Sequence, residues 1–171
     1  MILPICLYGE KVLRKKCEEV PFKKDISELV SDMFDTMRKF NGCGLAAPQI
    51  GKSIMLFITE YPDESENLVS TVFINPKFSV RKGSTYSILE EGCLSIPGVY
   101  IPVRRADNIY VEYFNEKWQI ERKNIDDFPA RIFLHEYDHL FGKLISDYRE
   151  KMSDDEKLDL EEKLKSISKN I

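Results

Sequence analysis

The only two histidines of this 171-residue chain lie in one short stretch, FLHEYDHLFG, at residues 133–142. His135 and His139 are four residues apart, with Glu136 next to the first of them. On a helix, residues i and i+4 face the same way, so both imidazoles can bind one ion beside a carboxylate base. The alternative is an amphipathic helix with two buried, hydrogen-bonded histidines. Because both histidines of the chain fall in one pentapeptide, we favour a metal hydrolase site.

A catalytic ion needs a third protein ligand and one position left for water. The extended pattern H-E-x-x-H-x-x-G-x-x-H fails, because its last position is Ile145. A glutamate of a later helix is one candidate, at Glu156, Glu161 or Glu162. The other is Cys93 in LEEGCLSIPGV, where a cation would deprotonate the thiol, although a lone cysteine is usually an inert buried residue.

A second stretch with unusual residues is NGCGLAAPQIG, at residues 41–51. Its glycines and alanines have little side-chain bulk, which lets another group approach the backbone closely. Gln49 adds an amide that can donate a hydrogen bond. Taken alone, the stretch could equally be a tightly packed connection between a helix and a strand.

Composition and charge narrow the class of protein. The chain is 43% hydrophobic and 32% charged, with a net charge of −4, which does not favour nucleic acid as a partner. No apolar run is long enough to span a membrane, and the N-terminus lacks the features of an export signal. The four cysteines form no C-x-x-C pair. We therefore expect reduced thiols and a cytoplasmic protein.

The pattern along the chain predicts an α+β fold. An apolar stripe indicates a helix over residues 25–42, and a second helix, carrying the histidines, is expected over 128–141. Between them lie short runs rich in β-branched and aromatic residues, at 54–59, 69–75, 77–82, 86–90, 99–104, 108–114 and 117–121, with a hairpin turn at Asn115–Glu116. This order predicts largely antiparallel sheets around a central helix.

The last segment differs from the rest in composition. We expect residues 1–146 to form the catalytic domain and residues 147–171 to be a charged C-terminal helix or tail of the same domain. Ser153 and Glu156 match a capping box at the start of this helix. The helix is expected to pack loosely, and a frayed solvated tail is the alternative.

Together, three stretches resemble the motifs of the peptide deformylase family: GCGLAAPQ at 42–49, EGCLS at 91–95 and HEYDH at 135–139. They occur in the family's order and spacing, and the resemblance extends from the N-terminus to about Ile145. Two positions depart from the family pattern. Leu134 replaces the usual glutamine before the histidine motif, and Val103–Arg104–Arg105 replaces V-P-R.

The resemblance implies a set of metal ligands, namely Cys93, His135 and His139. The ion would be one divalent cation per chain, with Fe(II) as the native metal and zinc, nickel or cobalt as substitutes. Glu136 would act as general base and then general acid. Gln49 and the backbone N–H of Leu94 would stabilise the oxyanion.

The same resemblance implies the substrate, which would be the N-formyl group of a nascent peptide that begins with formyl-methionine. The ribosome is a further candidate partner. Cys43, Ile88, Phe128 and Ile132 are our candidates for the apolar pocket of the methionine side chain, and Gly44, Glu91 and Gly92 complete the expected substrate site. We also expect an ion pair between Arg105 and Glu91, with Arg104 as the second choice of partner.

Two other readings predict different behaviour. A metalloprotease that uses the same helix with a carboxylate as third ligand would not need Cys93. A metal-stabilised binding domain without catalysis would not depend on Glu136.

Overall fold

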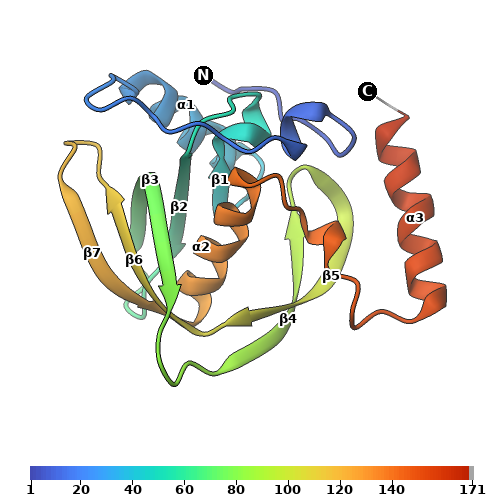
Figure 1. Cartoon of the computed structure of the whole chain (residues 1–171). Helices are drawn as coiled ribbons and strands as arrows, with labels where there is room; N and C mark the ends of the chain where they lie inside the picture. Colours follow the sequence, from blue (N-terminus) through green and yellow to red (C-terminus); the bar gives the residue numbers. More distant parts are fainter. Residues whose placement is uncertain (170–171) are drawn as a thin grey trace.

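The computed structural model of the chain describes residues 1–169 (Figure 1). Its elements in chain order are η1 (Lys11–Arg14), α1 (Ser27–Lys39), β1 (Gly44–Ala46), η2 (Ala47–Ile50), β2 (Leu56–Pro62), β3 (Leu68–Val80), β4 (Tyr86–Cys93), β5 (Ile96–Ala106), β6 (Asn108–Phe114), β7 (Ile120–Asp126), α2 (Asp127–Leu140), η3 (Ile145–Asp147) and α3 (Asp154–Ser168). The expected α+β fold is confirmed.

The strands form two antiparallel sheets. One has five strands in the order β1-β2-β3-β6-β7, and the other consists of β4 and β5 alone. The runs predicted at 69–75 and 77–82 are one strand, β3, whose pairing with β6 shifts between Ile74 and Lys77. The predicted hairpin joins β6 to β7, with its turn after Phe114.

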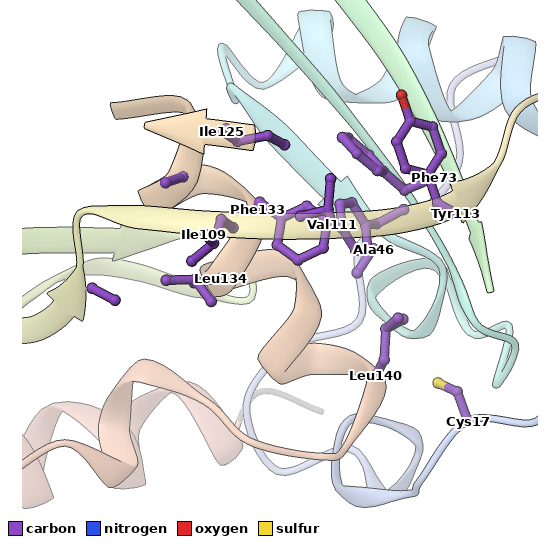
Figure 2. Close-up of a cluster of buried hydrophobic side chains, with 13 residues drawn as sticks. Cys17, Ala46, Phe73, Ile109, Val111, Tyr113, Ile125, Phe133, Leu134 and Leu140 are labelled. Atoms are coloured by element: carbon purple, nitrogen blue, oxygen red, sulfur yellow. The ribbon is translucent and has the colours of Figure 1, made fainter. Parts of the chain in front are cut away.

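The helix α2 lies between the two sheets, as predicted for a central helix (Figure 1). Its apolar face packs on the five-stranded sheet, where Phe133 contacts Phe57 and Phe73 with ring centroids 5.1 Å apart in both pairs. Figure 2 shows Phe133 among the side chains of β3 and β6. The opposite face of α2 is therefore free to carry the histidine motif.

The helix α1 ends next to the first glycine-rich stretch. Val30, Met33 and Met37 are buried and share a hydrophobic cluster with Leu45 of β1. Four residues after the C-cap Phe40, the chain enters β1, and the N–H of Gly42 donates to the carbonyl of Met37 across 2.9 Å. Packing of the helix stripe thus places residues 42–44 at the end of the sheet.

The C-terminal helix packs more closely than expected. The capping box is confirmed: the N–H of Glu156 donates to Ser153 Oγ, and the N–H of Ser153 donates to Glu156 Oε2. Leu160 and Leu164 are buried in a cluster with residues of η1 and β5. The expectation of loose packing is therefore wrong. Within residues 1–169, no helix is both long and apolar enough to cross a membrane.

Candidate active site

Cys93, His135 and His139 come together although the cysteine and the first histidine are 42 positions apart in sequence. Their ligand atoms all lie within 4.8 Å of one another, and Cys93 Sγ is 3.4 Å from His139 Nε2. Cys93 is the last residue of β4, and the histidines lie one turn apart on α2. One sulfur and two imidazole nitrogens at this spacing fit a single divalent transition-metal ion.

The later glutamates considered as third ligands have other roles. Glu156 caps α3, and Glu161 pairs with Arg149. Glu162 is exposed on the same helix, and none of the three belongs to the cluster of ligand atoms found among the described residues. Among the described residues, the thiolate set is thus brought together, and the carboxylate set is not.

Glu91 holds the imidazole of His135 in place. The Nδ1 of His135 donates to Glu91 Oε1 across 2.9 Å, which leaves Nε2 for the ion. Arg105 donates to both oxygens of Glu91 at 2.9 Å, so the predicted Arg105–Glu91 pair is confirmed. Burial by itself would raise the pKa of Glu91, but the hydrogen bonds from His135 and Arg105 lower it to about 2. Arg104 instead lies over the ring of Tyr86.

Glu136 is a buried carboxylate of the site, and one of its oxygens lacks a hydrogen bond within the described residues. Its side chain is only 4% exposed, and its Oε2 has no hydrogen-bond partner within the described part of the chain. Burial raises the pKa of Glu136 to about 7. A buried acceptor without a partner, on a residue that lines the same cleft as Cys93 and His135, fits a site built to hold an ion and its water.

Gln49 points its amide at the metal donors. Its Oε1 accepts a hydrogen bond from the N–H of Ala46 at 2.9 Å, which fixes the orientation of the amide. Its Nε2 then donates to Ser95 Oγ at 3.3 Å and lies 3.5 Å from Cys93 Sγ. Leu94 follows Cys93 in the turn between β4 and β5 and also lines the cleft.

The donors open into a cleft of about 810 Å³. Of the residues expected to bind substrate, the cleft is lined by Cys43, Gly44, Glu91, Gly92, Phe128 and Ile132. Ile132 is 6% exposed and Phe128 is 52% exposed, so the first lies deep and the second at the rim. Ile88 is outside the lining residues, on the exposed part of β4.

Sequence reasoning missed several residues that support the site. Arg131 is buried and donates to Glu91, and Asp138 accepts hydrogen bonds from Arg105 and from the hydroxyl of Tyr148. Arg131 precedes His135 by four residues on a predicted helix, and this spacing could have revealed it. Leu134, which departs from the family pattern, is buried in the core cluster around Phe133.

The fold and the site define a mononuclear metal-dependent hydrolase, with two histidines and a glutamate on one helix and a cysteine from a neighbouring strand. Comparisons with known proteins agree. The family model described as polypeptide deformylase matches residues 2–155. The peptide deformylase of Karelsulcia muelleri is 45% identical over 86% of this chain and 78% of its own length, and that of Cytophaga hutchinsonii is 38% identical over 99% and 92%.

Comparison with solved structures also finds peptide deformylases. A peptide deformylase from Legionella pneumophila has a TM-score of 0.82 at 32% identity, covering 99% of this chain and 96% of that one. One from Synechococcus elongatus, in complex with actinonin, has a TM-score of 0.83 at 34% identity, covering 96% and 85%. The chain belongs to the peptide deformylase family. It is a hydrolase that removes the N-formyl group from newly synthesised peptides that begin with formyl-methionine, and the family uses a single metal ion.

Proposed function

We propose that Cys93, His135 and His139 hold the metal ion of this deformylase and that Glu136 carries the proton of the reaction. One observation carries this assignment above the others: Glu136 Oε2 is buried without a hydrogen-bond partner in residues 1–169, and Glu136 lines the same cleft as Cys93 and His135. When bound, a divalent ion supplies Lewis acidity and lowers the pKa of its water to about 7.

The remaining steps belong to residues of the chain. Glu136 accepts the proton of the water as the water attacks the formyl carbon. It then donates this proton to the leaving nitrogen, which frees formate and the amine of methionine. The amide of Gln49 and the N–H of Leu94 donate to the developing oxyanion, and losing one such donor typically costs about 10²–10³ in rate.

Small residues near Glu136 support selection of a formyl group. Gly44 lies against the Glu136 side chain, so there is little space on that side of the reacting carbon. A formyl carbon carries only hydrogen, whereas an acetyl group adds a methyl that this space would exclude. Cys43, Phe128 and Ile132 line the same cleft and form the proposed apolar site for the methionine side chain, with Glu91 and Gly92 on the facing strand.

The native ion is proposed to be Fe(II), with zinc, nickel or cobalt able to occupy the same donors. The proposed location is the cytoplasm, where nascent formylated peptides emerge, and the ribosome is a proposed partner. We further propose that residues 1–146 are the catalytic domain and that residues 147–171 belong to it as its C-terminal helix or tail. The burial of Leu160 and Leu164 supports this last assignment.

Glu136→Gln tests the assignment of the proton carrier. The variant keeps a side chain of the same size but loses the base. We expect it to retain one metal ion per chain and to hydrolyse a formyl-Met peptide about 10²–10⁴-fold more slowly. Metal content and kcat are measured on the same anaerobically purified sample.

Glu112→Gln is the matched control, because Glu112 lies on β6 and is paired with Arg122 away from the cleft. It should keep both metal and wild-type kcat. Near wild-type turnover in metal-loaded Glu136→Gln would assign the proton transfer to another group.

A further inference from the structure

The β4–β5 sheet is not hydrogen-bonded to the five-stranded sheet. The chain enters it after Val80 and leaves it at Ala106, and its far end carries Cys93 and Leu94. This end must lie correctly over α2, because the other two metal donors are on that helix. No strand pairing joins the two sheets, so other contacts hold the hairpin in position. The N–H of Tyr8 donates to the carbonyl of Ser95, and apolar residues of β5 pack in a cluster with Leu13. Side chains of α2 add hydrogen bonds to both strands of the hairpin.

Arg131 makes most of the hydrogen bonds between α2 and the hairpin. Its side chain is 7% exposed. Its Nη1 donates to Glu91 Oε2 at 2.7 Å and to the carbonyl of Val103 at 2.9 Å. Its Nη2 donates to both the carbonyl and the Oγ of Ser87 at 2.9 Å. One guanidinium of α2 therefore binds β4 at two places and β5 at a third.

Arg105 has a different set of partners. It lies on β5, donates to both oxygens of Glu91, and reaches Asp138 of α2 at 2.8 Å. Without Arg131, the Arg105–Glu91 and His135–Glu91 contacts would still be available. Unlike Arg105, Arg131 also binds Ser87, through its carbonyl and Oγ, and the carbonyl of Val103, and these groups belong to the hairpin rather than to the metal donors.

We propose that Arg131 is a positioning residue that sets the width of the substrate cleft. Residues 90–93 of β4 and Phe128 and Ile132 of α2 line the cleft, and so does Arg131 itself. From α2, Arg131 binds both strands of the hairpin that carries residues 90–93. This inference rests on the proposed function, in which the methionine side chain occupies this space. Arg131 then affects the affinity for the peptide, whereas Arg105 affects the affinity for the metal.

The test compares Arg131→Lys with Arg105→Lys in the zinc-loaded enzyme, using a formyl-Met dipeptide. A lysine ammonium is a point charge and cannot reproduce the fork of bonds to Ser87, Val103 and Glu91. For Arg131→Lys we expect KM to rise about tenfold, with kcat within about threefold and unchanged zinc dissociation. For Arg105→Lys we expect zinc affinity to fall by about 10–100-fold.

A rise in KM with a nearly unchanged kcat distinguishes loss of positioning from simple destabilisation of the enzyme. A partly unfolded enzyme has fewer active molecules, so its apparent kcat falls while its KM stays constant. Arg122→Lys is the matched control, because Arg122 lies on β7 and is 55% exposed in its pair with Glu112. It should leave KM, kcat and zinc dissociation at wild-type values.

Ser87→Ala gives an independent measurement, because it removes one acceptor of Arg131, together with the hydrogen bond from Ser87 Oγ to Asp107, and no residue of the active site. We expect KM to rise about threefold in the wild-type background and not at all in the Arg131→Lys background, as residues in one network are not additive. If Arg131→Lys fails to fold, Ser87→Ala tests the proposal alone, and an unchanged KM overturns it.

Wild-type KM in Arg131→Lys, or zinc loss equal to that of Arg105→Lys, would also overturn the proposal. The proposed function fails in a different way. It is refuted if the zinc-loaded wild-type chain shows no deformylation, or if Glu136→Gln retains full turnover.

Discussion

Gly44 lies so close to Glu136 that no larger residue fits between them. A β-carbon built on Gly44 would lie 2.8 Å from both Cγ and Cδ of Glu136, which is closer than such atoms normally approach. The glycine therefore allows the glutamate to lie where its carboxylate faces the metal donors. The contact links the first glycine-rich stretch of the sequence directly to the histidine motif.

Gly44→Ala should consequently displace Glu136 without removing a metal ligand. We expect metal content to stay at the wild-type level and kcat to fall by about 10²-fold, as expected for a displacement of about 1 Å at a reacting group. Parallel metal analysis and steady-state kinetics measure both quantities. Full activity in Gly44→Ala would show that Glu136 can move without loss of function.

Gly83→Ala controls for the general cost of replacing a glycine. Gly83 has a φ of +81° in an open turn, where an added β-carbon meets nothing within 4 Å. This variant should lose some stability through backbone strain and keep its kcat. The two alanine variants thus separate strain from displacement of the base.

Cys93→Ala should lose metal and activity together, because it removes one of three donors. Cys6→Ala, Cys17→Ala and Cys43→Ala should keep the metal. Burial raises the pKa of the Cys6 thiol to about 11 and also raises that of Cys17, so both stay protonated. Metal analysis of the four variants checks the expectation, and full metal content in Cys93→Ala would contradict the ligand assignment.

Much of the candidate site could be predicted because its residues lie in short sequence motifs with fixed spacing. The spacing of His135 and His139 places them on one helix face whatever the rest of the fold does. The Arg105–Glu91 pair was also predictable, because a carboxylate beside a metal loop needs a partner and few arginines lie nearby in sequence. The structure pairs these two residues as expected.

The contacts of Arg131 could not be predicted in the same way. Its acceptors at Ser87 and Val103 come from two strands, and their position relative to α2 depends on how the whole hairpin folds. The packing of α3 was misjudged for a similar reason. Its apolar stripe is narrow, and its partners, such as Leu13 and Val99, come from distant parts of the chain.

Iron-loaded enzyme should lose activity in air, and zinc-loaded enzyme should not. A ferrous ion next to the Cys93 thiolate can be oxidised by dioxygen together with the sulfur, whereas zinc has no redox chemistry. The apoprotein is loaded with each metal, and activity is followed in air alongside mass analysis of the peptide that contains Cys93. Equal air stability of the two forms would remove the case for iron as the labile native metal.

The stability of the chain should depend on Glu60 at neutral pH but not in acid. Glu60 is 8% exposed and accepts hydrogen bonds from Arg38 and Ser70, and the bond from Arg38 lowers its pKa. A lowered pKa in the folded state adds stability above the unfolded pKa, and this stability is lost as the pH falls through the folded value. Because Arg38 is 55% exposed, solvent screening limits the contribution to about 1 kcal/mol.

Glu60→Gln should therefore unfold at lower urea concentration than wild type at pH 7, and the difference should shrink as the pH falls below about 4. The exposed Glu64→Gln provides the control and should match wild type at every pH. A difference that persists unchanged into acid would mean that packing, rather than the charge of Glu60, stabilises this part of the sheet.

Leu164→Ala tests whether the C-terminal helix belongs to the same folding unit as the catalytic residues. Leu164 is 1% exposed in a cluster that includes Leu13 and Ile96, so truncation should cost about 2–5 kcal/mol in the free energy of unfolding. Leu158→Ala is the control, because Leu158 is 66% exposed on the same helix and should change stability by less than about 0.5 kcal/mol.

If α3 and the body fold together, Leu164→Ala shifts one cooperative urea transition, seen equally by circular dichroism and by loss of activity. An early helical transition that leaves activity intact would instead assign α3 to a separate unit, because Leu164 would then stabilise the helix without stabilising the β5 strand that leads to the active site.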